Sequence, residues 1–139
     1  MKNIEPVSTI MSTNIITLKK DDELETAELL FKRYKIRHIP VVKGKIVIGM
    51  LSYTDLLRIS FADAVDETET NIETLVYNMF TIEQVMAKNV VTVKSDTTIK
   101  EVAVILAQKE FHALPVVDHG RLVGIVTTTD LIKYMLNHL

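Results

Sequence analysis

The stretch Gly49-Met50-Leu51-Ser52-Tyr53-Thr54-Asp55 recurs as Gly124-Ile125-Val126-Thr127-Thr128-Thr129-Asp130, so residue 49 corresponds to residue 124 at an offset of 75 residues. Each copy closes an apolar run with hydroxyl side chains and a carboxylate, just before another apolar run begins. The same offset pairs further residues without a gap: Met11 with Met86, Asn14 with Asn89, Thr17 with Thr92, Asp21 with Asp96, and Pro40-Val41-Val42 with Pro115-Val116-Val117. The sequence therefore predicts two copies of one structural unit.

Length and composition are those of one ordinary domain. Half of 139 residues would bury too little surface for comfortable stability, so the two copies are expected to share a core. A hydrophobic content of 47% with 24% charged residues is typical of a soluble globular protein. No stretch approaches the roughly 20 apolar residues of a membrane helix, and residues 1–6 lack an apolar segment of signal-peptide length. We expect a cytoplasmic protein without a membrane span.

Charge and cysteine content exclude several kinds of site. The net charge of −2 is spread evenly, without the basic stripe that nucleic-acid binding requires. Cysteine is absent, which excludes disulfides, zinc-thiolate sites and thiol catalysis. No two histidines have metal-ligand spacing, so no metal site is predicted.

Hydrophobic periodicity predicts the same order of elements in each copy. Short β-branched runs at 15–18 and 90–93 are expected to be strands, and amphipathic helices are expected over roughly 23–35 and 98–109. Asp22 and Glu25 have the spacing of a capping box for the first helix. A hairpin follows in each copy, and a second helix begins near Asp55 or Asp130.

The predicted fold class is α/β (α+β): two β-α-β-β-α repeats packed sheet to sheet around a pseudo-twofold axis, with two clefts between them. The first repeat is expected over 7–60 and the second over 81–139. Residues 61–80 have no counterpart and form an acidic linker, which apolar spacing predicts to be helical around 71–79.

Two motifs connect these repeats with a known family. Each repeat has Gly-x-[Val/Ile/Leu]-[Thr/Ser]-x-x-Asp after a strand, and a basic residue, Arg37 or His112, three places before Pro-Val-Val. In these motifs the sequence resembles a tandem pair of cystathionine β-synthase (CBS) domains, or Bateman module, over nearly its whole length. The resemblance implies regulatory binding of an adenosine-containing ligand such as AMP, ADP or ATP in the clefts. It also implies no required cofactor and no catalysis, and dimers of two modules.

The repeated carboxylates are the candidates for ribose binding. A carboxylate at a helix start is stabilised by unpaired backbone N–H groups and can accept both hydroxyl protons of a ribose. The resemblance gives this role to Asp55 and Asp130, and Gly49 and Gly124 are expected to keep their strands slim where the ligand approaches. Alternatively, the two aspartates are simply helix N-caps, each contributing about 1 kcal/mol.

Two further groups complete the candidate site. Adenine needs an apolar slot with backbone groups at its edge, and phosphates need cations and hydroxyls. The adenine candidates are Ile15, Ile16, Thr17, Ile39, Pro40, Val90, Val91, Thr92, Leu114 and Pro115. The phosphate candidates are Ser52, Thr54, Thr127, Thr129, Arg37, His38 and His112. Because arginine can bridge two phosphate oxygens and a neutral histidine donates once, the two sites are expected to differ.

Other functions remain open. The Gly-x-Ser-x-Gly, Walker and His-Glu-x-x-His motifs are absent, so no catalytic residue is predicted, although Asp55 and Asp130 could form a hydrolytic carboxylate pair. An assembly module with empty clefts would instead use apolar positions on the last helices, namely Leu57, Ile59, Ile132 and Met135, for homodimer contacts. S-adenosylmethionine or NAD would satisfy the same ribose and adenine contacts.

Overall fold

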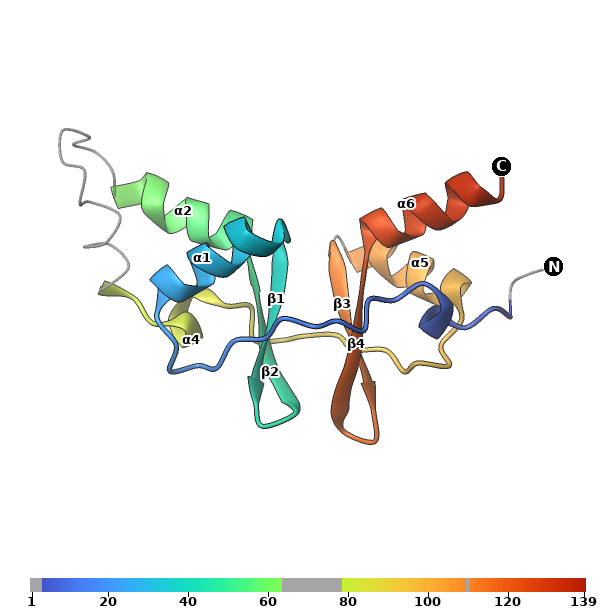
Figure 1. Ribbon diagram of the computed structural model, residues 1–139, viewed down its shortest axis with the longest axis horizontal. Helices are drawn as coiled ribbons and strands as arrows, with labels where there is room; N and C mark the ends of the chain where they lie inside the picture. Colours follow the sequence, from blue (N-terminus) through green and yellow to red (C-terminus); the bar gives the residue numbers. More distant parts are fainter. Residues whose placement is uncertain (1–3, 64–78, 110) are drawn as a thin grey trace. The chain divides into compact units, whose positions relative to one another are not determined.

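The computed structural model describes residues 4–63, 79–109 and 111–139, and forms two compact units (Figure 1). The Asp55 unit comprises Ile16–Val90, and the Asp130 unit comprises Met1–Ile15 together with Val91–Leu139. Most of the helix predicted around 71–79 lies outside the described residues. Within the described ranges, no helix is long and apolar enough to cross a membrane.

Both units contain a helix, a hairpin and a second helix in the same order, together with one short helical segment. The Asp55 unit contains α1 (Leu24–Tyr34), β1 (His38–Lys43), β2 (Ile46–Ser52), α2 (Tyr53–Asp63) and the short α4 (Ile82–Val85). The Asp130 unit contains a 3-10 helix η1 (Val7–Thr9), α5 (Ile99–Lys109), β3 (Ala113–Asp118), β4 (Arg121–Thr127) and α6 (Thr128–Asn137). In each unit two longer helices accompany one hairpin (Figure 1). The predicted mixed class with two hairpins and amphipathic helices is confirmed.

The hairpins are two-stranded antiparallel sheets with matching irregularities. A register shift falls between Val41 and Val42 in one and between Val116 and Val117 in the other. Turn residues with positive φ, Gly44 at 65° and Gly120 at 78°, reverse the chain. Glycine favours these positions because it has no Cβ.

The strands predicted at 15–18 and 90–93 are reduced to single bridges. Leu18 pairs in parallel with Val41, through Leu18 N–H to the Pro40 C=O at 3.0 Å and Val42 N–H to the Leu18 C=O at 2.8 Å. Val93 repeats the bridge in the other unit. The first run stops there because the chain turns at once.

That turn also explains why the predicted capping box of α1 is wrong. Asp22 Oδ2 accepts from Lys19 N–H at 2.8 Å and so closes the turn, while the residue that caps α1 is Glu23, without a side-chain cap bond. Helix α5, by contrast, is capped by Thr98, whose Oγ1 accepts from Glu101 N–H at 3.1 Å.

In each unit, the hairpin pairs with the short segment that precedes the other repeat in the sequence. In the Asp55 unit, Met50 and Ala87 exchange two backbone hydrogen bonds of 3.0 and 2.9 Å, and Ile82 is fully buried. In the Asp130 unit, Ser12 and Ile125 exchange bonds of 2.8 and 3.0 Å. The compact units therefore differ from the repeats 7–60 and 81–139 expected from sequence, in which each short segment was joined to the repeat that follows it.

Each unit has its own apolar core, which corrects the expectation of one core shared by the two copies, and corresponding residues of the two repeats build the two cores. Helix residues pack on the inward side chains of the hairpin, as periodicity predicts. The Asp55 unit buries Leu18, Leu24, Ala27, Phe31, Ile39, Val41, Leu51, Leu56, Ile82 and Met86. The Asp130 unit buries Val7, Val93, Ile99, Val102, Leu106, Leu114, Val116, Val126 and Leu131.

Candidate functional site

The repeated carboxylates lie in the first turn of the helix that follows each hairpin. Ser52 N–H donates to Asp55 Oδ2 at 3.2 Å, and Asp55 N–H donates to Ser52 Oγ at 3.0 Å. Thr127 and Asp130 form the same reciprocal pair, with distances of 2.9 and 3.1 Å. These bonds satisfy N–H groups that a helix start leaves unpaired, and they hold each carboxylate at the positive end of the helix dipole.

This geometry corrects the alternative in which the aspartates are N-caps. The capping residues are Ser52 and Thr127, and the aspartates are the third residues of α2 and α6. Ser52 Oγ and Thr127 Oγ1 therefore accept a backbone bond already, and each keeps its hydroxyl proton and one lone pair for a ligand.

Each aspartate commits one carboxylate oxygen to the cap. Oδ2 accepts the backbone bond in both, so Oδ1 is the oxygen left for another donor. Within the residues described, Oδ1 of Asp130 has no hydrogen-bond partner. Both residues are half-buried, so the carboxylates are oriented without being closed off.

Arg58 engages the corresponding oxygen of Asp55, although no sequence motif pointed to it. Its Nη1 lies 3.3 Å from Asp55 Oδ1, with 71% of the arginine side chain and 21% of the aspartate side chain exposed. The i, i+3 spacing on one helix is the pattern that could have revealed the pair. Lys133 holds the equivalent position on α6 and forms no ion pair with Asp130. The two carboxylates are therefore electrostatically unequal.

The phosphate candidates of the first repeat gather around Asp55. The Arg37 C=O accepts from Tyr53 N–H at 2.9 Å, and His38 stands opposite Ser52 in the β1–β2 register. Arg37 is exposed and His38 half-buried. With Thr54, exposed in the first turn of α2, we call Arg37, His38, Ser52, Thr54 and Asp55 the Asp55 cluster.

The second repeat builds a matching group. The His112 C=O accepts from Thr128 N–H at 3.0 Å, which holds His112 beside the start of α6. Thr129 is exposed in the first turn. We call His112, Thr127, Thr129 and Asp130 the Asp130 cluster. The structure thus brings each set of phosphate candidates together with its aspartate.

The adenine candidates differ in how deeply the structure buries them. Ile39 and Leu114, with 0% and 1% of their surface exposed, belong to the cores of their units, and their role as slot walls stays a prediction. Their strands are buried on both faces here, as their unbroken apolar character indicates.

The other adenine candidates remain predictions. Pro40 and Pro115 are buried, and their C=O groups already accept bonds from Leu18 and Val93 at 3.0 and 3.1 Å. Residues on the two short runs are half-buried or exposed: Ile15, Ile16, Val90 and Val91 are half-buried, and Thr17 and Thr92 are exposed.

The two strand glycines face methionine side chains and not an open slot. A Cβ built on Gly49 would lie 2.9 Å from Met86 Cγ and Cε and closer still to Sδ. On Gly124 it would lie 3.0 and 3.1 Å from Met11 Cγ and Cε. The glycines therefore admit the methionines, which corrects the prediction that they make room for a ligand.

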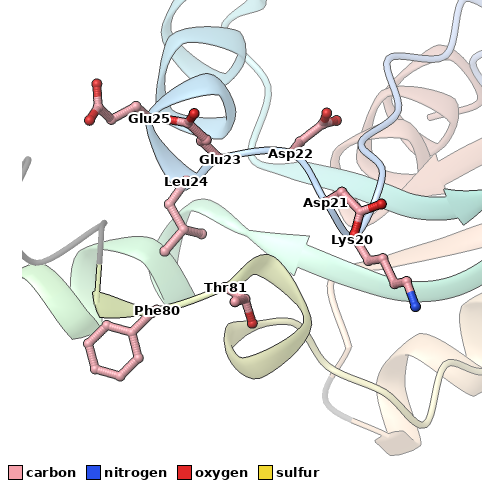
Figure 2. Close-up of a pocket in the computed structure, with 8 residues that line it drawn as sticks. All are labelled: Lys20, Asp21, Asp22, Glu23, Leu24, Glu25, Phe80 and Thr81. Carbon is pink, nitrogen blue, oxygen red and sulfur yellow. The ribbon is translucent and has the colours of Figure 1, made fainter.

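A pocket of about 320 Å³ lies elsewhere in the Asp55 unit, at the start of α1 and beside Thr81 (Figure 2). Leu24 points toward Phe80 and Thr81, whereas the carboxylates of Asp22 and Glu25 point away from that space (Figure 2). Among the described residues, no three histidine or acidic side chains are placed to hold a metal ion. The pocket contains none of the predicted site residues.

Comparisons with known proteins agree on one family. The family model of the CBS domain matches residues 7–62 and again residues 82–137. The protein MJ1225 of Methanocaldococcus jannaschii is 27% identical over 132 residues, which cover 94% of this chain and 47% of MJ1225. The chain thus spans about half the length of that relative.

Two solved structures carry adenosine-containing ligands. The CBS domain pair of protein MJ0100, in complex with 5′-methylthioadenosine and S-adenosyl-L-methionine, matches with a TM-score of 0.81 and 26% identity, covering 98% of this chain and 99% of that one. CBSX2 in complex with AMP matches with a TM-score of 0.79 and 25% identity, covering 96% and 97%.

Proposed function

The chain belongs to the CBS domain family, and from that premise we propose that it is a regulatory module that binds AMP, ADP or ATP without catalysing a reaction. The observation that carries the proposal is the repeated carboxylate at the start of α2 and α6, which gives one oxygen to the cap and presents the other. The ligands of MJ0100 and CBSX2 support the adenosyl class.

Helix capping alone does not explain why the residue at positions 55 and 130 is an aspartate. Helix α5 obtains its cap from Thr98 and Glu101, and α4 obtains a full capping box from Thr81 and Gln84. Any acceptor at the third position suffices for the cap. Among the capped helices that the structure describes, that acceptor is a short aspartate only after the two hairpins, and its oxygens stay close to the helix end where a ribose can reach them.

In the proposed complex, Oδ1 of each aspartate accepts ribose hydroxyl protons. Arg37, His38 and His112 donate to the phosphates, and the hydroxyl groups of Ser52, Thr54, Thr127 and Thr129 add neutral donors. Binding stabilises the module by mass action, and a regulated partner responds to the difference in affinity between its states.

The first test is a thermal-shift panel of AMP, ADP, ATP, S-adenosylmethionine, 5′-methylthioadenosine and NAD on the full chain. A ligand present at 100 times its Kd adds about 2.7 kcal/mol to the free energy of unfolding. An increase in Tm with an adenine nucleotide supports the proposal. An increase only with S-adenosylmethionine or NAD reassigns the ligand, and no increase with any compound contradicts the function.

A second candidate function is assembly of two copies through the last helices. On α6, Ile132, Met135 and Leu136 are 51%, 56% and 66% exposed at i, i+3 and i+4, and Leu57 on α2 is 46% exposed. Ile59 instead packs partly against the core, so it is a weaker candidate than sequence suggested. We propose a homodimer. Sedimentation of wild type against Ile132→Asp with Met135→Asp should show a dimer becoming a monomer.

A further inference from the structure

We propose that Arg58 makes the Asp55 cluster selective for nucleotides over nucleosides. The inference rests on the proposed function, because it concerns which adenosyl ligand the same carboxylate accepts. Arg58 Nη1 lies 3.3 Å from Asp55 Oδ1, the oxygen that the capping bond leaves for ribose. Because the proposed ribose contact brings two hydroxyl protons to this oxygen, it needs both of the oxygen's lone pairs and therefore competes with the guanidinium.

The guanidinium can be displaced at little cost. The pair is exposed, with 71% of the arginine side chain in solvent, and exposed pairs of this kind contribute little to stability. Long helical side chains lean toward the N-terminus of their helix, so Arg58 stays near the first turn of α2 after it leaves Asp55.

A phosphate changes the outcome of that displacement. An uncharged nucleoside leaves the guanidinium without an anionic partner, whereas the phosphate of a nucleotide offers two oxygens to the arginine fork. The Arg37 C=O accepts from the N–H of Tyr53, the first residue of α2, so a second arginine lies beside the start of that helix. Arg58 therefore penalises adenosine and favours AMP.

The Asp130 cluster lacks this device. Lys133 stands at the position equivalent to Arg58 and is not paired with Asp130. An ammonium group is a single point charge and does not bind phosphate in the two-oxygen manner of arginine. Discrimination by phosphate is therefore assigned to one cluster of the two.

The test measures AMP and adenosine affinities by calorimetry in an Asp130→Ala background, where only the Asp55 cluster reports. We expect Arg58→Gln to weaken AMP about tenfold and to strengthen adenosine by up to about fivefold, so that the AMP-to-adenosine preference falls at least tenfold. The matched control is Lys133→Gln, which removes the same charge from the equivalent position and should leave the ratio unchanged.

Two results overturn the inference. An unchanged ratio in Arg58→Gln would remove Arg58 from ligand selection while leaving the proposed function intact. An equal fall in Lys133→Gln would reduce the effect to net charge. If neither AMP nor adenosine binds before Arg58 is changed, the inference also fails, and the thermal-shift panel with ADP and ATP decides the proposed function separately. Arg58 is a solvent-exposed helical residue, so its substitution is not expected to unfold the chain, which circular dichroism checks.

Discussion

Replacing Gly49 with alanine tests how closely the hairpin of the Asp55 unit packs on the segment after the linker. The new Cβ would lie 2.9 Å from Met86 Cγ and Cε, inside van der Waals contact. Met86 is 7% exposed and belongs to the core, so it has little room to withdraw. The substitution therefore forces the methionine and its neighbours to shift.

The expected loss is the balance of two terms. Overpacking a core by one methyl group costs about 1–3 kcal/mol, and replacing a strand glycine with alanine returns about 0.5–1 kcal/mol of backbone entropy. The net destabilisation is about 0–2.5 kcal/mol, and its midpoint of about 1.2 kcal/mol is equivalent to a fall in Tm of about 4 °C. Gly124→Ala should cost less, because Met11 is half-buried and can swing outward.

The assay is urea unfolding followed by circular dichroism for wild type, both glycine variants, Met86→Ala, and Gly49→Ala combined with Met86→Ala. The double variant should lose less stability than the sum of the single losses, because the alanine methyl fills space that the methionine vacates. A Gly49→Ala protein as stable as wild type, or single losses that simply add, would refute the packing argument.

Three further predictions follow from single contacts. Lys35→Gly should raise the free energy of unfolding by about 0.5–1 kcal/mol in urea titrations, since Lys35 ends α1 at φ 55° and glycine adopts that conformation without a Cβ clash. Hydrogen bonds from Ser95 lower the pKa of Asp118 in the folded state, so this residue stabilises the fold above its unfolded pKa and loses that contribution as pH falls through the folded value. The difference in free energy of unfolding between wild type and Asp118→Asn should therefore shrink as the pH is lowered toward about 3. Tyr134→Phe removes the 3.0 Å bond that the hydroxyl donates to Glu5 Oε1, and it should lower Tm and speed proteolysis of the N-terminal segment, whereas unchanged cleavage would count against that anchoring role.

Local patterns predicted the regular elements closely. The helix expected over 23–35 runs from Leu24 to Tyr34, and that expected over 98–109 runs from Ile99 to Lys109. Apolar periodicity and the cap at Thr98 depend on residues that are close together in the chain, so a single sequence is enough to predict them. Asp22 does not cap α1 because its carboxylate accepts an equally local turn bond from Lys19 N–H.

The repeat pattern could not predict which short segment packs against which hairpin. The 75-residue offset makes the two hairpins equivalent, so it cannot tell which one Met86 or Met11 packs against. The backbone bonds of Met50 with Ala87 decide this for the first hairpin, and they depend on long-range contacts that periodicity does not encode.

The sequence predicted which residues gather at the start of α2, but not their helical positions or their burial. Grouping of Arg37, Ser52 and Asp55 follows from the register of the hairpin; the sequence predicted the hairpin and not its register. Ser52 and Asp55 have the spacing of a capping box, and attention to that spacing would have placed the aspartate at the third helical position. Burial of Ile39 could not be judged, because an apolar strand residue reads alike whether it faces a core or a slot.

The most direct test of the proposed sensing function is calorimetric titration of AMP into wild type, into Asp55→Ala combined with Asp130→Ala, and into Glu101→Ala. Glu101 is the matched control, because it is also an acid at the third position of a helix capped by threonine but stands outside both clusters. The account predicts saturable heat with wild type and Glu101→Ala, and none with the double variant. Equal binding by all three proteins, or loss of binding in Glu101→Ala as well, would contradict it.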